Sequence, residues 1–372
     1  MYHAELKYQI GLTLIKGIGN VLAKNLVAYV GSAEGVFSER QKTLSKIPGI
    51  GEMLSREIVK QNVLERAEEE VLFIEKNKIQ CSFFTDRDYP YRLKECADSP
   101  VLLFSRGNGM LNTGKFVGIV GTRNATEQGK ENCKNLIADL AGLQPNINIV
   151  SGLAYGIDIC AHKATLELGL PTIGVLGHGL DRIYPSIHRS VAVKILENGL
   201  LLTEYLSNTT PDKPNFVQRN RIIAGLCDAV VVVESGSKGG SLITAVMAND
   251  YNRDVFAFPG RVTDELSIGC NMLIKNNQAA LIESGKDMMR FMSWETGEKK
   301  ADQPTQTALF VDMTEEEIEL LSVLRRFPDG IQVNEFIVIL KKPFNKISAL
   351  LLNMEFSGWV KCLPGGVYKA TI

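Results

Sequence analysis

The chain lacks the long apolar segments of a membrane protein and the leader of an exported one. None of its apolar runs approaches the roughly 20 residues that a transmembrane helix requires. The first residues, from Met1 to Lys7, contain neither the basic nor the apolar region of a signal peptide. We therefore expect a cytoplasmic protein that makes no contact with membranes.

Residues that hold metals or form disulfides are also scarce. The chain has four histidines, seven cysteines and no CxxC pair. Most of the cysteines sit in apolar runs, which is typical of buried, reduced thiols. His162 and His178 do not have the spacing of metal ligands. We therefore expect no metal site and no cofactor.

A strong net charge is absent as well. The 41 Lys and Arg residues nearly balance the 42 Asp and Glu residues, which gives a formal net charge of −1. This balance argues against a protein that binds nucleic acid through bulk positive charge. It leaves room for a local basic pocket, because screening limits electrostatic attraction to nearby charges.

A short repeat marks the N-terminal region, residues 1–62. Segment 14–24 contains a Gly-Ile-Gly hairpin that opens an amphipathic helix, and segment 46–56 repeats this pattern. It is the helix-hairpin-helix pattern, whose glycines let backbone N–H groups approach a DNA phosphate. Such repeats also serve purely for packing or protein contact, and the residues favour neither role. We predict a helical, SAM-like domain and leave its DNA contact open.

Residues 63–293 predict a Rossmann-like, doubly wound α/β domain with a mostly parallel sheet. Apolar strands alternate with helices, as in right-handed βαβ units. The run from Ala229 to Val233 is wholly apolar, which is typical of a central strand buried on both faces. The predicted strands are 81–84, 101–104, 117–120, 147–150, 172–176, 200–204, 229–234 and 255–258, with a helix at 65–78.

Nearly every strand of this domain runs into a Gly- or Ser-rich turn. In a parallel sheet such turns lie along the carboxyl edge, where ligands bind. Helices that begin there direct free N–H groups and a positive dipole end outward, which suits phosphate. Several converging turns with adjacent cations predict a polyanion rather than a single nucleotide. The turns are 121–123, 151–156, 177–181, 235–241 and 259–260.

Cationic residues adjoin these turns. Arg123 directly follows the first turn, where a guanidinium can bind phosphate in bidentate fashion. Arg219 and Arg221 are predicted to open a helix. Cations at a helix start interact unfavourably with the helix dipole unless an anion or a carboxylate compensates their charge. Lys238 lies within a Gly/Ser turn and follows the same logic. We favour ligand contact over internal ion pairs for these residues, whereas Asp158 is predicted to cap a helix.

Common catalytic and nucleotide signatures are missing. The turn at 118–121 is not the dinucleotide fingerprint GxGxxG, and GxxxxGK[ST] does not occur. NAD binding and P-loop ATP hydrolysis are therefore disfavoured. No Ser–His–Asp order or carboxylate pair stands out. We expect no catalytic residue and a protein that is not an enzyme.

The C-terminal region is predicted to form a separate domain. Residues 294–311 have the polar composition of a linker. Residues 312–372 combine helices, the first capped by Thr314, with a hairpin at a Gly-Gly turn, which predicts a winged-helix domain. Lys341, Lys342 and Lys346 face either a DNA groove or solvent, and we favour solvent.

Longer motifs surround the turns, at 118–123, 151–158 with 161–162, 177–181 with 184–185, 219–225, 238–245, 254–260 and 269–271. Together they closely resemble the motifs of the DNA processing protein A (DprA/Smf) family. The similarity extends over about residues 60–290. The chain departs from the family pattern at Val217 and Cys227, and at Ser186, where the resemblance implies a lysine in some relatives. The last departure puts one backbone contact in doubt, and Arg189 is a candidate to replace that contact.

The resemblance implies a function in DNA recombination. Family members bind single-stranded DNA, protect incoming strands in natural transformation, load the RecA recombinase and form homodimers. The alternative is a nucleotide-processing, phosphoribohydrolase-like enzyme on a related sheet, but the catalytic glutamate of that class has no equivalent after the turn at 237–245. The residues and the resemblance together predict DNA contacts, without sequence preference, at Gly121, Thr122, Arg123, Ser151, Gly152, Arg219, Asn220, Arg221, Lys238, Gly239, Gly240 and Ser241.

Overall fold

The computed structural model describes residues 2–143, 146–294, 314–327, 330–363 and 366–371. The chain divides into two compact units, Met1–Thr296 and Gly297–Ile372. Nearly all of the predicted linker, 294–311, lies outside the described residues. No helix in the described ranges is long and apolar enough to cross a membrane.

The first unit begins with helices that are linked by two Gly-Ile-Gly hairpins, as the repeat predicts. Each hairpin packs against the helix that follows the other. Gly17, at φ +83°, lies against Leu54, and Gly49, at φ +86°, lies against Leu22. A side chain at either glycine would strain the backbone and meet the opposite leucine. The helices are α1 (Tyr2–Leu14), α2 (Asn20–Val30), α3 (Ala33–Ser38), α4 (Gln41–Leu44), α5 (Gly51–Lys60) and α6 (Leu64–Lys76).

The two repeats differ in what their polar residues contact. In the first repeat, Asn20 accepts a hydrogen bond from the backbone of Val101 at 3.0 Å. Lys24 donates to Ser99 Oγ at 2.7 Å. Its counterpart in the second repeat, Arg56, is exposed. The first repeat therefore uses its polar face to attach the helical region to the sheet region, which supports a packing role for that copy.

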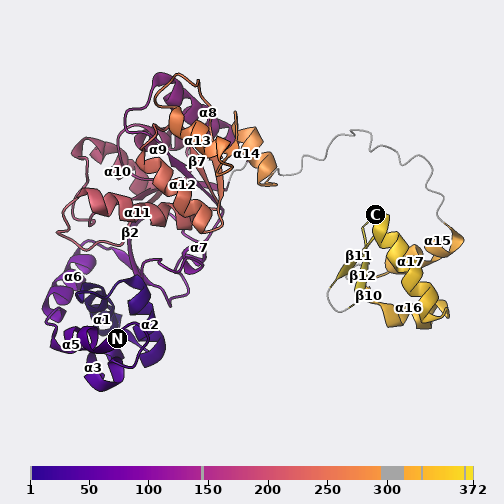
Figure 1. Cartoon of the computed structure of the whole chain (residues 1–372), viewed down its shortest axis with the longest axis horizontal. Coiled ribbons are helices and arrows are strands. Elements are labelled where there is room, and N and C mark those ends of the chain that lie inside the picture. Colours follow the sequence, from indigo (N-terminus) through magenta and orange to yellow (C-terminus); the bar gives the residue numbers. More distant parts are fainter. Residues whose placement is uncertain (1, 144–145, 295–313, 328–329, 364–365, 372) are drawn as a thin grey trace. The chain divides into compact units, whose positions relative to one another are not determined.

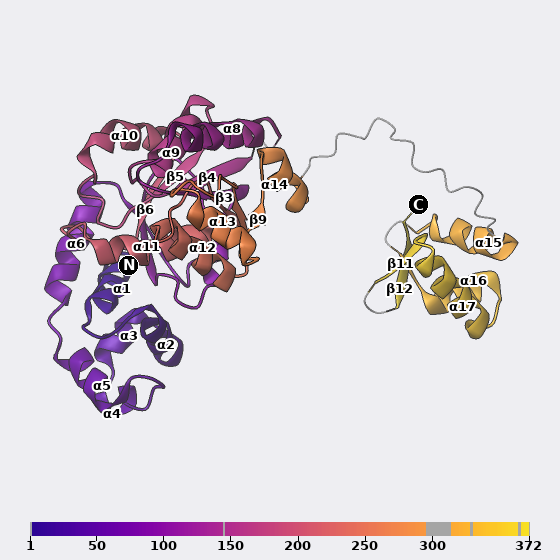
Figure 2. The same cartoon turned by 45° about the horizontal axis from the view of Figure 1, so that its top comes forward.

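A nine-stranded sheet forms the centre of the unit (Figures 1 and 2). The strand order is β1-β2-β6-β5-β4-β3-β7-β8-β9, and only the pairs that involve β2 are antiparallel. The chain winds outward from β3 to β6 and then returns beside β3 with β7, which makes the predicted doubly wound topology. The strands are β1 (Gln80–Phe83), β2 (Leu102–Gly107), β3 (Lys115–Val120), β4 (Ile147–Ser151), β5 (Thr172–Val175), β6 (Gly199–Thr203), β7 (Ala229–Val232), β8 (Asp254–Ala257) and β9 (Ala280–Leu281).

Helices cover both faces of the sheet. On one face of the sheet, apolar side chains of α8, α9 and α14 pack against side chains of β3, β4 and β7. On the opposite face, apolar side chains of α11, α12 and α13 form a second core with the sheet. The wholly apolar β7 contributes to both, which explains its uninterrupted run of valines. The helices are α7 (Tyr91–Lys94), α8 (Glu127–Leu143), α9 (Ile157–Glu167), α10 (Arg189–Glu197), α11 (Lys213–Leu226), α12 (Gly240–Asp250), α13 (Ile268–Lys275) and α14 (Gly285–Phe291).

The second unit contains three helices and a small sheet in the described part of residues 297–372. Thr314 caps the first helix in a reciprocal capping box with Glu317, as predicted. Lys342 and Lys346 form ion pairs with Glu316 on that helix. Assignment of the unit to the winged-helix class stays a prediction. The elements are α15 (Glu315–Leu324), β10 (Ile331–Gln332), α16 (Val333–Leu340), α17 (Phe344–Phe356), β11 (Val360–Leu363) and β12 (Val367–Ala370), with sheet order β10-β12-β11.

Gly156 joins the first two turns of the carboxyl edge. It precedes α9 at φ +75° and ψ −123°, a conformation that is restricted almost entirely to glycine. A Cβ atom there would collide with the carbonyl oxygens of Thr122 and Arg123. The backbone of the second turn thus packs directly on the backbone of the first.

We predict that Gly156→Ala lowers the free energy of unfolding by about 1–3 kcal/mol, because alanine is strained at this φ and ψ. The matched control is Gly142→Ala, which lies in α8 with open space around the added methyl group. Alanine should stabilise that position by up to about 1 kcal/mol. Urea denaturation measures both changes, and equal stability of the two variants would contradict the packing described.

Candidate nucleic-acid interface

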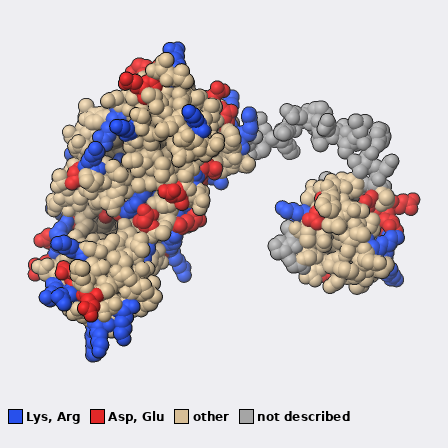
Figure 3. Space-filling model, viewed as in Figure 1, with Lys and Arg blue, Asp and Glu red and all other residues tan. Residues whose placement is uncertain are grey.

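A groove runs along the carboxyl edge of the sheet, at the ends of β3 and β7. These strands flank the point where the winding reverses, which is the usual ligand position in open α/β sheets. Figure 3 shows acidic and basic side chains interspersed on the face in view, in keeping with the balanced net charge. Most of the predicted contact residues line the groove: Gly121, Thr122, Arg123, Arg219, Asn220, Lys238, Gly239, Gly240 and Ser241.

Arg123 presents an exposed cation on a fixed turn. The backbone N–H of Thr122 donates to the carbonyl of Glu234 at 2.7 Å, which pins the turn to the end of β7. The Arg123 side chain is exposed, and its guanidinium lies 5.8 Å from the ring centroid of Phe216. No carboxylate within the described ranges pairs with it. Its charge is therefore available to an anion.

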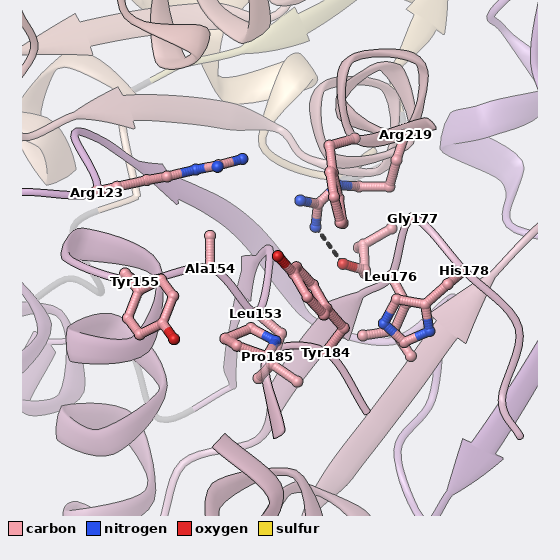
Figure 4. Close-up of a pocket in the computed structure, with 12 residues that line it drawn as sticks. Arg123, Leu153, Ala154, Tyr155, Leu176, Gly177, His178, Tyr184, Pro185 and Arg219 are labelled. Carbon is pink, nitrogen blue, oxygen red and sulfur yellow. Dashed lines mark hydrogen bonds between the residues drawn. The ribbon is translucent and has the colours of Figure 1, made fainter. Parts of the chain in front are cut away.

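Arg219 supplies a second cation from the opposite wall. In Figure 4 the guanidinium groups of Arg123 and Arg219 extend toward one another across the pocket. Arg219 is only 5% exposed and donates to the carbonyl oxygen of Val175. Its Nε atom is buried and has no hydrogen-bond partner in the described structure. A donor that is left without a partner in the interior is costly, so an acceptor that reaches it gains free energy.

A buried carboxyl partly balances Arg219. Asp158 lies in the first turn of α9, and its pKa is raised chiefly by burial, while Arg219 opposes that rise. Burial lowers the pKa of Arg219, and repulsion from Arg123 adds to this effect. Asp158 therefore faces a cation, and the prediction that it caps α9 is wrong, because the N-cap of this helix is Gly156 and no side chain caps it. The pocket therefore has two cations, Arg123 and Arg219, but one carboxyl, Asp158, so one positive charge is left without a negative partner.

Ser151 and Gly152 lie beneath the groove and do not line it. Ser151 is fully buried and donates to the backbone oxygen of Ile119 at 2.6 Å. A Cβ atom on Gly152 would fall on the guanidinium of Arg219 and on the carboxylate of Asp158. Ser151 and Gly152 therefore support the groove residues through packing and hydrogen bonding. They are not among the residues that line the groove, contrary to the expectation that they contact the ligand.

The prediction that Arg219 and Arg221 open a helix is wrong. Helix α11 begins at Lys213, because Asp212 and Pro214 set an earlier start, so both arginines lie well inside it. Arg221 is buried and forms an ion pair with Glu204 at the end of β6. It does not line the groove. For Arg221 the structure therefore shows an internal ion pair, the alternative that the sequence favoured less than contact with a ligand.

Two helix N-termini near the groove differ in how they are capped. The carboxylate of Glu234 accepts from the backbone N–H and the hydroxyl of Thr126, at 2.8 and 2.6 Å, and so occupies the start of α8. Helix α12 begins at Gly240, and its N-cap residue, Gly239, provides no side-chain cap. Lys238 is exposed beside it. The carboxylate of Glu234 thus compensates the positive end of the α8 dipole, while the N-terminus of α12 is left without such a carboxylate and suits an external anion.

Sequence reasoning missed several residues of the site. Glu234 is 108 residues from the threonine that it holds, so no local pattern reveals its role. Tyr184 and Phe216 stack with their ring centroids 5.6 Å apart and form an apolar wall. They border a small cavity that also contacts Arg123 and Arg219 (Figure 4).

His162 serves the framework, whereas His178 lines the cavity. His162 is fully buried between the hydroxyl of Thr172 and the carbonyl of Gly152. Burial lowers the pKa of His162 to about 4, so the ring is neutral at neutral pH. No group of three or more potential metal ligands occurs among the described residues.

These features define a Rossmann-like α/β protein whose carboxyl edge is arranged for anions. Comparison with known proteins places it more narrowly. A family model described as DNA recombination-mediator protein A matches residues 80–293, and one described as a SAM-like helix-hairpin-helix tandem matches residues 10–61. The chain belongs to the DNA recombination-mediator protein A (DprA/Smf) family. The resemblance and the helix-hairpin-helix repeat predicted from the sequence are both confirmed.

Two relatives are similar to this chain over more than half of its length. DNA processing protein DprA of Streptococcus pneumoniae is 45% identical over 204 residues, 55% of this chain and 71% of the relative. Protein Smf of Synechocystis is 36% identical over 294 residues, 77% of this chain and 72% of the relative.

Solved structures agree with the fold. The crystal structure of Streptococcus pneumoniae DprA superposes with a TM-score of 0.63 at 35% identity, covering 76% of this chain and 97% of that one. A Helicobacter pylori DprA structure, described for its single-stranded DNA binding mode, gives 0.52 at 32% identity and covers 58% and 96%.

We predict that Arg221→Ala lowers the free energy of unfolding by about 3–5 kcal/mol, because it leaves the buried carboxylate of Glu204 without its ion-pair partner. Burial raises the pKa of Glu204 above its ordinary 4.5, and loss of Arg221 raises it further. The Glu204 carboxyl then binds its proton more tightly in the folded variant than in the unfolded chain. The loss of stability relative to the unaltered protein should therefore be smallest below about pH 4.5 and grow as the pH rises.

Denaturation at several pH values measures this deficit. Adding Glu204→Gln to Arg221→Ala should recover part of the lost stability and remove the pH dependence, because the uncompensated charge is gone. An Arg221→Ala protein with normal stability and weakened DNA binding would place Arg221 in the groove instead.

Proposed function

We propose that this protein binds single-stranded DNA in the carboxyl-edge groove and acts as a recombination mediator in the cytoplasm. In this role it protects incoming strands during natural transformation and loads the RecA recombinase onto them. The membership of the DNA recombination-mediator protein A family supports the general role. The printed description of the Helicobacter pylori relative, a single-stranded DNA binding mode, supports the ligand.

The observation that carries the proposal is the pair of arginines at the switch point of the sheet. Arg123 is exposed and unpaired within the described residues, and it reaches toward the buried Arg219. The uncapped N-terminus of α12 and the side chain of Lys238 line the same groove. A row of phosphates along the groove would meet cations and free N–H groups in sequence.

The remaining features of the groove suit a flexible strand better than a duplex. The Gly/Ser turns offer backbone donors, which read phosphates and not base edges. The stacked Tyr184 and Phe216 present an apolar wall, and Tyr184 is 48% exposed. Aromatic faces accept any base by stacking, so this wall adds affinity without strong sequence preference.

An enzymatic function finds little support in the same groove. Its carboxylates, within the described part of the chain, are Asp158 and Asp212. Asp158 is set against Arg219, and the turn at Lys238 leads into α12 without a glutamate. We therefore propose a binding protein and not a phosphoribohydrolase. Incubation with nucleoside monophosphates tests this choice, because the enzymatic alternative requires release of the free base.

We predict that Arg123→Ala weakens binding of oligo-dT by about tenfold to 150-fold and leaves the thermal melt unchanged. The lost charge-assisted contact corresponds to about 1.5–3 kcal/mol. Arg290→Ala, an exposed arginine on α14 that does not line the groove, is the matched control and should bind normally. Fluorescence anisotropy measures both. Equal affinity of Arg123→Ala and the control would refute the site.

We also predict that removal of residues 297–372 changes the affinity for oligo-dT by less than tenfold, because all the groove residues belong to Met1–Thr296. We also propose that the protein forms the homodimer that its family resemblance implies, through the sheet region, so the truncated protein should remain a dimer in size-exclusion chromatography with light scattering. A larger loss of affinity would make the second unit part of the strand-binding site, and a monomer would move the dimer interface there.

A further inference from the structure

A further exposed aromatic ring borders the small cavity at Arg123. Tyr155 lies in the turn between β4 and α9, and its side chain is 49% exposed. It lines the cavity together with Tyr184, whose side chain is about equally exposed. In Figure 4 the apolar side chains of Leu153 and Pro185 lie between the two tyrosine rings. The cavity thus carries an exposed aromatic ring on each side of an apolar strip.

The ring of Tyr155 is held by a buried histidine. The rings of Tyr155 and His188 meet edge to face, with their centroids 5.0 Å apart and their planes at 66°. His188 is itself buried, and its Nδ1 atom is hydrogen-bonded to the carbonyl oxygen of Leu153 at 2.8 Å. Because this contact already restricts the ring, a ligand that stacks on its exposed surface costs little further side-chain freedom.

Backbone contacts set the position of Tyr155 relative to Arg123. The next residue, Gly156, packs on the carbonyl oxygens of Thr122 and Arg123. The N–H group of Ile157 donates to the carbonyl oxygen of Thr122 at 3.2 Å. The turn that bears the cation and the turn that bears the ring are therefore tied together. A strand with a phosphate at Arg123 meets the ring at a fixed spacing.

The hydroxyl group of Tyr155 has no hydrogen-bond partner among the described residues. Other tyrosines of the same unit use their hydroxyl groups to hold the fold. Tyr89 donates to the carbonyl oxygen of Pro100, and Tyr251 donates to the carboxylate of Asp98. Tyr155 has no such framework contact at its hydroxyl group, which leaves the exposed part of its ring available to a ligand.

We propose that Tyr155 is a base-stacking residue of the groove and recognises the unpaired bases of a strand whose phosphate lies at Arg123. This proposal rests on the strand-binding function proposed above. Every base has an aromatic face, so bases of any sequence can stack on the ring. The bases of a duplex are stacked and paired with one another, and they reach the ring only after unpairing. Tyr155 therefore helps the groove to select single strands.

Fluorescence anisotropy with oligo-dT tests the proposal. Tyr155→Ala should weaken binding by about fivefold to 150-fold, which corresponds to the loss of one stacked base. Tyr155→Phe keeps the ring and should bind normally. Tyr29→Ala is the matched control, because Tyr29 is 65% exposed on α2 and lines neither the groove nor the cavity. Thermal melts check that each variant is folded. Tyr155→Leu, which keeps an apolar side chain but removes the ring, replaces an unstable alanine variant.

A sugar-phosphate strand of the same length without bases separates stacking from other effects. Tyr155→Ala should bind this abasic strand as well as the unaltered protein does. Arg123→Ala should bind both strands more weakly, because it removes a phosphate contact.

The outcomes keep the two proposals apart. Weak binding by Arg123→Ala with normal oligo-dT binding by Tyr155→Ala would refute the role of Tyr155 alone and leave its ring to another partner. Equal weakening of both strands by Tyr155→Ala would also overturn it, because the residue would then act through the shape of the turn. Normal oligo-dT binding by both variants would refute the groove itself.

Discussion

A guanidinium held in the interior is the constraint on which the site depends. Arg219 is almost fully buried, and its neighbourhood is arranged around that charge. Asp158 supplies a nearby carboxyl, the end of β5 supplies the carbonyl of Val175, and Gly152 leaves the space that the guanidinium fills. Removing a cation from water is expensive, so each of these contacts is needed to keep it there.

The buried arginine also explains why the exposed one is effective. Arg123 projects over Phe216 into the same cavity, and its turn is fixed by Glu234 and by the packing of Gly156. The two cations therefore meet at a defined separation without ordering a flexible loop first. A phosphate between the two guanidinium groups would interact with two positive charges at once, which favours an anionic ligand over water at this position.

The sheet and its turns were predictable because strands, helices and glycine turns leave local patterns. The apolar run of β7 and the position of Arg123 after β3 were placed correctly on this basis. The helix that contains Arg219 was not, because Asp212 and Pro214 start it earlier than the charged residues suggest. Contacts such as Arg221 with Glu204 and Glu234 with Thr126 join distant segments, and no local pattern encodes them.

The helix-hairpin-helix repeat illustrates a further limit. The two copies are alike in sequence, yet the structure uses Lys24 of the first copy to hold the loop at Ser99 and leaves Arg56 of the second exposed. Pattern alone fixes the hairpins, whereas the surface against which each one packs decides its role. The two copies of the repeat therefore have different surroundings, and each copy has its own structural role.

The most direct test of the phosphate-binding groove is the salt dependence of single-stranded DNA affinity. A groove that neutralises phosphates with Arg123, Arg219 and Lys238 predicts a log–log slope of about −2, or about −0.7 for each phosphate. In Arg123→Ala the slope should become shallower by about 0.7. A slope near zero, or one that is unchanged by Arg123→Ala, would contradict the account.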